Sequence, residues 1–149
     1  MSNLKLYIDA RSLCNNIQDG KNIYARELIG SLQSTKPNGV DLILIGDCKN
    51  PKIDLSFSRL WHFKVAKMVN NDPQAIFFSP TSFLTACLIQ RPSLVTVHDL
   101  IAFMHPTQVS FKAAFIENIC LRILNYRSNV QYLTVSDSTK RALKSFFSL

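Results

Sequence analysis

Residues 4–45 decide the fold, and they read LKLYIDARSLCNNIQDGKNIYARELIGSLQSTKPNGVDLILI. Residues 4–8 alternate apolar side chains with one lysine, which predicts a strand that enters the core. Between residues 22 and 33, apolar side chains recur with the spacing of a helix, at Ala25, Leu28, Ile29 and Leu32. Residues 40–45 form a second short apolar run. A strand, a helix and another strand joined by a crossover predict a parallel sheet.

The rest of the chain continues this alternation. Further strands are predicted at residues 75–78, 94–97 and 132–135, and further helices at 56–69 and 110–126, with Ser136 as the N-cap of a last one. The helix at 110–126 is apolar around more than one stripe, so we expect it to be buried on much of its circumference. Five strands that alternate with four helices predict one α/β domain over residues 1–149. Its expected architecture is a single Rossmann-like, doubly wound, mainly parallel sheet.

The composition fits one cytoplasmic globular domain. Apolar residues make up 47% of the chain, and 17 Lys+Arg against 10 Asp+Glu give a net charge of +7. That charge suits an anionic membrane or a phosphorylated ligand, whereas nucleic acid is not expected, because no binding module or tight basic cluster is present. The sequence has no C-x-x-C pair and no apolar stretch of signal or membrane-spanning length. We therefore expect reduced thiols and a cytoplasmic protein, with peripheral contact on the inner face of the membrane left open.

Ligands of doubly wound sheets bind beyond the carboxyl ends of the strands, so the residues that follow each predicted strand are candidates for a site. They are Arg11, Gly20, Lys21, Ser79, Thr81, His98, Asp99 and Ser136. His98 is the strongest, because imidazole exchanges a hydrogen bond or a proton with a hydroxyl near neutral pH. The competing interpretation is a histidine whose ring is satisfied by Asp99 or by the backbone. The spacing of His98, Asp99 and His105 matches no familiar metal site, so no metal is expected.

The segment Gly20-Lys21-Asn22 precedes the first predicted helix, where backbone N–H groups can approach a phosphate. One glycine is a weak version of such a loop. A plain turn with Asn22 as the helix cap is therefore the favoured interpretation, and Lys21 can still neutralise an anion.

A basic, aromatic stretch at residues 57–67 allows contact with an anionic membrane. Trp61 would then lie at the level of the headgroups, and the cations beside the phosphates would be Arg59, Lys64 and Lys67. The alternative is a helix that covers one face of the sheet.

Several segments occur in one order along the chain: Tyr7-Ile8-Asp9-Ala10-Arg11, Ile23-Tyr24-Ala25-Arg26-Glu27-Leu28-Ile29, Arg59-Leu60-Trp61 before Ile76-Phe77-Phe78-Ser79-Pro80, Val95-Thr96-Val97-His98-Asp99-Leu100-Ile101 with His105-Pro106, and Thr134-Val135-Ser136-Asp137-Ser138-Thr139-Lys140-Arg141. In this order and spacing they resemble the N-terminal domain of family 4 (group 1) glycosyltransferases of the GT-B fold. The resemblance covers nearly the whole chain. Its most specific pieces are the I-D-A-R, T-V-H-D-L-I and V-S-x-x-T-K patterns.

The resemblance implies an enzyme that moves a sugar from a nucleotide-sugar donor to a hydroxyl of a sugar or lipid-linked acceptor. The transfer would retain the anomeric configuration and need no metal. His98 would lie close to the transferred sugar, with Asp99 orienting it. The residues near the donor phosphates would be Arg11, Gly20 and Lys21, and those of the acceptor rim Ser79, Thr81 and Ser136.

The chain departs from the family at two motifs. The family commonly reads G-G-I-G-R-Y before the first helix, where this chain has Asp19-Gly20-Lys21-Asn22-Ile23-Tyr24, and many relatives read His-Ser-Pro where this chain has Phe78-Ser79-Pro80.

A larger departure concerns the donor side. In the family a C-terminal domain with an E-x7-E motif binds the nucleotide, and these 149 residues hold no such segment. A missing or separate donor domain is therefore an expected partner, because the chain alone lacks most groups that would stabilise the leaving group. The alternative is a non-catalytic sugar-binding or membrane-docking module that acts with a partner subunit.

Overall fold

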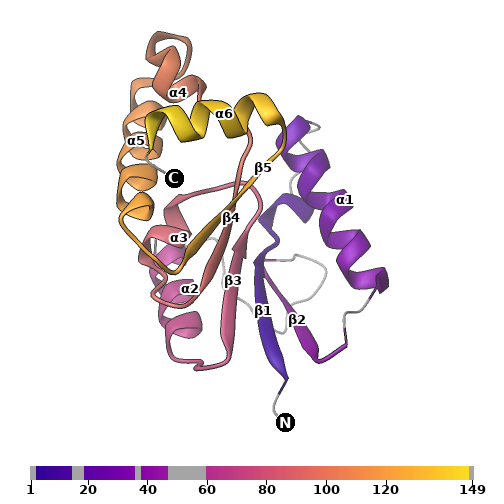
Figure 1. Ribbon diagram of the computed structural model, residues 1–149. Coiled ribbons are helices and arrows are strands. Elements are labelled where there is room, and N and C mark those ends of the chain that lie inside the picture. The colour runs from indigo at the N-terminus through magenta and orange to yellow at the C-terminus, as the bar shows by residue number, and fades with distance from the viewer. Residues whose placement is uncertain (1–2, 15–18, 36–37, 47–59, 148–149) are drawn as a thin grey trace.

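The protein, seen in a computed structural model that describes residues 3–14, 19–35, 38–46 and 60–147, is built on one parallel sheet (Figure 1). Within these residues five strands pair in the order β2-β1-β3-β4-β5, and every pair is parallel. They are β1 (Leu4–Asp9), β2 (Val40–Ile45), β3 (Ala75–Ser79), β4 (Ser93–Val97) and β5 (Val130–Thr134). The predicted α/β fold with a Rossmann-like, doubly wound sheet is confirmed.

Helices connect the strands of the described residues. They are α1 (Gly20–Thr35), α2 (Trp61–Asn70), α3 (Leu84–Leu88), α4 (Ile101–Met104), α5 (Phe111–Asn125) and α6 (Asp137–Phe146), with 3-10 turns η1 (Arg11–Leu13) and η3 (Pro106–Gln108). The short helices α3 and α4 were not predicted, because four or five residues are too few to display a helical repeat. In the part of the chain described, no helix has the length and apolar character that crossing a bilayer requires.

The start of α1 differs from the expectation. The helix begins at Gly20, and Oδ1 of Asp19 accepts a hydrogen bond from the backbone N–H of Asn22 at 2.8 Å. Asp19 is therefore the cap, and the prediction that Asn22 caps this helix is wrong. A carboxylate at this position also favours the positive end of the helix dipole. Of the helix predicted at 56–69, residues 56–59 lie outside the described residues.

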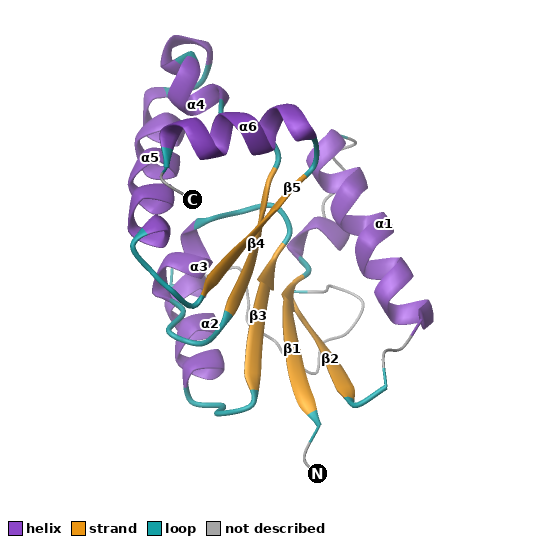
Figure 2. Cartoon of the chain, in the orientation of Figure 1, coloured by secondary structure: helices purple, strands orange, loops and turns teal. Residues whose placement is uncertain are grey.

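The two faces of the sheet carry separate apolar clusters, because successive side chains of a strand point to opposite faces. On one face, Tyr7, Phe77 and Val95 pack with residues of α2, α3, α5 and α6. On the other face, Ile8 and Phe78 pack with Ile29 of α1. Figure 2 shows α1 on the opposite side of the sheet from α2, α3 and α5. The sheet is therefore the middle layer of the domain, with the larger core on the side of α2, α3 and α5.

The amino edge of the sheet is held by Asp72, in the turn between α2 and β3. Its carboxylate accepts hydrogen bonds from Lys5 Nζ and from the Tyr7 hydroxyl, both at 2.9 Å. Burial and the bond to Asp72 raise the pKa of Tyr7 to about 12. These bonds fix β1 beside β3 at the end of the sheet that faces away from the candidate site.

Helix α6 begins as predicted, with Ser136 as its N-cap. The Ser136 hydroxyl accepts from the backbone N–H of Thr139 at 3.1 Å, and Asp137 lies in the first turn. The Thr139 hydroxyl in turn donates to the backbone carbonyl of His98 at 3.1 Å. The cap therefore joins α6 to the carboxyl end of β4.

We expect Ser136→Ala to lower the free energy of unfolding by about 1 kcal/mol, because it removes the oxygen that pairs with a helix N–H. Urea titration followed by circular dichroism measures the change. Ser138→Ala is the control, because Ser138 is exposed in the first turn of the same helix. This variant should change the free energy of unfolding by less than about 0.5 kcal/mol. Equal losses in both variants would contradict the role of Ser136.

Candidate functional site

A buried ion pair lies at the carboxyl end of β1, on the edge of the sheet where the strands end. Asp9, the last residue of β1, is 1% exposed, and its carboxylate binds Arg11 in a bidentate manner, at 2.9 Å from Nε and 2.7 Å from Nη2. The guanidinium also lies 3.8 Å from the centre of the Trp61 ring, a cation–π contact. Because a buried carboxylate needs a fully hydrogen-bonded partner, Arg11 first of all neutralises Asp9.

Gly46 makes room for this arrangement. It follows β2 with φ = 81°, and a Cβ built on it would lie 2.7 Å from Cγ of Arg11 and 3.5 Å from the Trp61 ring. Its carbonyl accepts a hydrogen bond from the thiol of Cys14 at 3.0 Å. Any larger residue at position 46 would strain the backbone and displace the Arg11 side chain.

A cavity of about 260 Å³ lies beside Arg11, at the carboxyl edge of the sheet. Its walls come from η1, the start of α2, the loop after β3, α3 and α5. The lining residues are Arg11, His62, Thr81, Ser82, Phe83, Leu84, Ile116 and Glu117. Hydroxyl, imidazole and carboxyl groups thus share the cavity with apolar side chains, a mixture typical of sites that orient a small polar ligand.

His62 enters the cavity wall from the first turn of α2. Its Nδ1 lies 2.7 Å from the Thr85 hydroxyl, and its ring meets Trp61 edge to face with centres 5.2 Å apart. Burial, and then the positive charge of Arg11, lower the pKa of His62 below its usual value. At neutral pH the ring is therefore an uncharged group that can both donate and accept a hydrogen bond.

Glu117 reaches the cavity from the inward face of α5. Burial raises the pKa of its carboxyl group, Lys21 opposes that shift, and Asp99 adds to it. Lys21 Nζ lies 3.6 Å from Oδ2 of Asp99. One lysine and two carboxyl groups, from α1, the loop after β4 and α5, therefore interact at this edge.

His98 follows β4 and is oriented by the backbone. Its Nε2 lies 2.7 Å from the carbonyl oxygen of Pro80, and its ring meets Tyr24 edge to face at 5.1 Å. Because a carbonyl only accepts, Nε2 is the protonated nitrogen. The Asp99 carboxylate accepts instead from the backbone N–H of Ile101 at 3.2 Å and pairs with Lys21. The expected orienting role of Asp99 therefore belongs to Pro80 and Tyr24.

Other predicted site residues have structural positions. Ser79 is fully buried and its hydroxyl donates to the backbone carbonyl of Ser82, so its expected place on the acceptor rim is wrong. Ser136 caps α6, whereas Thr81 does line the cavity. Gly20 is the first residue of α1, and no atom lies within 4 Å of a Cβ built on it. No close backbone approach in the described residues therefore requires a glycine at position 20.

Two interpretations were open for residues 57–67, and the structure describes this stretch from residue 60 onward. Trp61 is 3% exposed and packs into the core, so its expected place at the headgroups is wrong. The alternative, a helix that covers the sheet, is confirmed by its buried residues Trp61, Val65, Ala66 and Val69. Lys64 and Lys67 are exposed, and Arg59 lies outside the described residues.

Sequence reasoning missed His62 and Glu117. Glu117 is the one acidic residue between Asp99 and Asp137, in an otherwise apolar helix, and this isolation was a signal that could have identified it. His62 gave no such signal, because its place depends on how α2 meets η1. Among the described residues, no group of three or more His, Cys, Asp or Glu side chains is arranged to hold a metal ion.

Comparisons of the chain with models of protein families, with curated proteins and with solved structures find no match. The function of the chain must therefore be inferred from the chemistry of the site itself.

We expect Gly46→Ala to cost more stability than Gly39→Ala. Gly39 has a similar φ of 74° but open space around its Cβ position, so its substitution costs about 1–2 kcal/mol from backbone strain alone. Gly46→Ala adds the contact with Arg11. Urea unfolding measures both costs, and the fluorescence of Trp61, the single tryptophan, reports the stack. Equal costs and unchanged fluorescence would contradict the packing role of Gly46.

We expect Glu117→Gln to raise the free energy of unfolding at pH 7 and to have little effect near pH 3.5. A folded-state pKa above the unfolded value favours folding while the carboxyl is protonated, and this contribution is lost as pH rises through the folded pKa. Denaturant titrations at both pH values measure the effect, with Glu27→Gln as the control for removing a charge from an exposed helix position. A loss of stability at pH 7 would contradict the burial cost at Glu117.

Proposed function

We propose that this chain forms the acceptor-side half of a retaining glycosyltransferase, which transfers a sugar from a nucleotide-sugar donor to an acceptor hydroxyl. The observation that carries the proposal is the cavity in which His62, Thr81, Ser82 and Glu117 meet apolar side chains at the carboxyl edge of a parallel sheet. This edge is where doubly wound folds bind ligands. The order of motifs along the chain, which resembles that of family 4 glycosyltransferases, also supports the proposal.

The contents of the cavity favour a sugar. The hydroxyl groups of a sugar both donate and accept hydrogen bonds, and so do the uncharged His62 ring and the Thr81 and Ser82 hydroxyls. Phe83 and Leu84 offer apolar surface to the C–H faces of a sugar ring. Its volume of about 260 Å³ is below the roughly 300–1,000 Å³ of sites for drug-sized ligands, so it suits one sugar ring rather than a whole nucleotide sugar. A sugar or lipid-linked acceptor is therefore the proposed occupant.

The donor would approach from the side of α1. Lys21 and the N-terminal end of α1 at Gly20 offer positive charge to donor phosphates. Arg11 is less suited to that role, because Asp9 already occupies its fork. His98, which presents a ring fixed by Pro80 and Tyr24, would contact the transferred sugar. The nucleotide site and the stabilisation of the leaving group would come from a donor-binding domain, and the resemblance to family 4 glycosyltransferases implies no resident metal.

A sugar-binding module without catalysis is the second candidate. The ion pair of Arg11 with Asp9 favours this non-catalytic function, because a neutralised Arg11 attracts a donor phosphate only weakly. Both candidates place the protein in the cytoplasm, with peripheral contact to a membrane as a further part of the proposal. Turnover separates the two functions, whereas sugar binding is common to both.

We expect saturation-transfer NMR on the whole chain to detect binding from a panel of monosaccharides. Glu117→Gln and His62→Ala should weaken that binding about tenfold or more, because the first replaces a carboxyl group of the cavity by an amide and the second removes the imidazole. Glu27→Gln, on an exposed part of α1, should leave it unchanged. An absence of sugar binding, or binding that neither cavity variant alters, would overturn the proposal.

Supplying a donor-binding domain in trans with nucleotide sugars tests catalysis. Product formation that falls in His98→Ala supports the transferase. Turnover that His98→Ala leaves intact removes His98 from the mechanism, and sugar binding without turnover favours the non-catalytic module.

A further inference from the structure

The solvent-facing side of α5 is apolar. Phe111, Phe115, Ile119, Ile123 and Tyr126 are 84, 56, 41, 42 and 89% exposed. The expectation that this helix is buried on much of its circumference is therefore wrong for one face. A surface helix normally places polar residues on its outer face. An apolar outer face indicates that this face also contacts an apolar environment, in addition to the core on the inner face.

These five residues form one continuous stripe. At about 100° per residue, the four that belong to α5 fall within an arc of roughly 120° over about 18 Å of helix, and Tyr126 follows directly after the last residue of α5. The rings of Phe111 and Phe115 stack with centres 6.1 Å apart. Glu117 lies about 180° from the middle of the arc, on the side that faces the cavity. One side of α5 therefore faces the cavity, and the opposite side exposes the apolar stripe to solvent.

The charges within the stripe are all positive. Lys112 and Arg122 are exposed and fall inside the same arc, about 15 Å apart along the helix. Among the described side chains of α5, Glu117 is the single acid, and it points away from the stripe. We call the five apolar residues with these two cations the α5 surface. Helix α4, which contacts α5, also carries two exposed apolar residues, Ile101 and Met104, at 40 and 52%.

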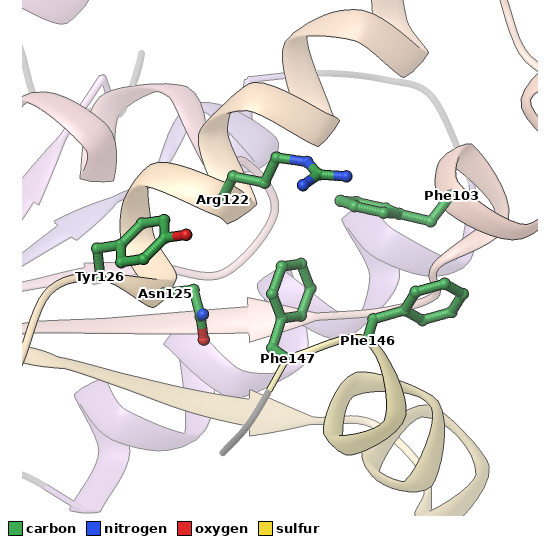
Figure 3. A pocket seen from close by; sticks show the side chains of 6 residues that line it. All are labelled: Phe103, Arg122, Asn125, Tyr126, Phe146 and Phe147. Atoms are coloured by element: carbon green, nitrogen blue, oxygen red, sulfur yellow. The ribbon is translucent and has the colours of Figure 1, made fainter.

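The α5 surface ends at a second cavity, of about 230 Å³ (Figure 3). Arg122 and Tyr126 line it together with Phe103, Asn125, Phe146 and Phe147. Figure 3 shows Arg122 extending from α5 toward the ring of Phe103. In the described residues, Oδ1 of Asn125 is buried without a hydrogen-bond partner. An anion that also carries hydrogen-bond donors would satisfy both Arg122 and Asn125.

We propose that the α5 surface docks the domain on an anionic lipid bilayer, with α5 lying in the plane of the interface. The apolar side chains would enter the boundary between headgroups and acyl chains, and Lys112 and Arg122 would pair with lipid phosphates. Aromatic residues at both ends of the stripe, Phe111 and Tyr126, suit this boundary.

Charge favours a membrane over a second copy of the chain. Pairing α5 with the α5 of another copy would bring Lys112 and Arg122 of both copies together without an acidic residue to neutralise them. An anionic bilayer supplies the missing negative charge and also accepts the apolar stripe. This surface differs from residues 57–67, where the aromatic anchor Trp61 is buried. The proposal does not depend on sugar transfer.

Sedimentation of the whole chain with phosphatidylglycerol vesicles tests the proposal, with phosphatidylcholine vesicles beside them. Binding is expected to phosphatidylglycerol and to weaken at 0.5 M salt, about the level at which surface charges are screened. F111S/F115S, and separately K112Q/R122Q, should each weaken it about tenfold or more. These side chains are exposed, so the variants should fold.

The matched control is F63S/K64Q on α2, which removes a phenylalanine of 61% exposure and an adjacent exposed lysine. It should leave vesicle binding unchanged. In Phe115→Trp, the fluorescence of the new indole should shift to shorter wavelength when vesicles are added, against the constant background of the buried Trp61.

No binding to phosphatidylglycerol, or equal loss in the α2 control, would overturn the proposal. So would a dimer in light scattering that F111S/F115S dissociates, because a second copy would then cover the surface.

Discussion

The structure depends on how one negative charge is accommodated at the end of β1. Asp9 is almost fully buried, and an unpaired carboxylate there would cost several kcal/mol. Arg11 meets it with two hydrogen bonds, Trp61 covers the guanidinium, and Gly46 leaves the space that the arginine stem needs. This set joins β1, β2 and α2. It also builds one wall of the cavity and contributes to the lowered pKa of His62.

The sequence was sufficient for the sheet but not for the roles of most site residues. Alternating apolar runs and one amphipathic helix predicted a mainly parallel sheet, because period and crossover are local properties of the chain. Which apolar face of a helix is buried is a tertiary property. For this reason the sequence left Trp61 open between a membrane and the sheet, and it lies in the core, whereas Phe115 was expected in the core and is exposed.

Hydrogen-bond partners explain the other differences. His98 was correctly placed at the carboxyl edge, but its ring is held by the carbonyl of Pro80, and a backbone partner eighteen residues away leaves no local signal. Ser79 ends β3 and was expected at the acceptor rim. Its side chain points to the same face of the sheet as that of Phe77, two residues earlier, and both are buried. Glu117 could have been found from its isolation among apolar residues. His62 could not, since its environment is made by four separate elements.

The parallel pairing of β1 with β3 has a consequence for how the chain folds. Tyr7 pairs with Phe77, and Lys5 and Tyr7 bind Asp72, so β1 gains this neighbour only when residues some seventy positions later are in place. Asp9 and Arg11, by contrast, are two residues apart and can meet while still hydrated. Their desolvation must wait for the slow, non-local step that closes the sheet. The ion pair is thus local in sequence, whereas its burial depends on pairing between distant parts of the chain.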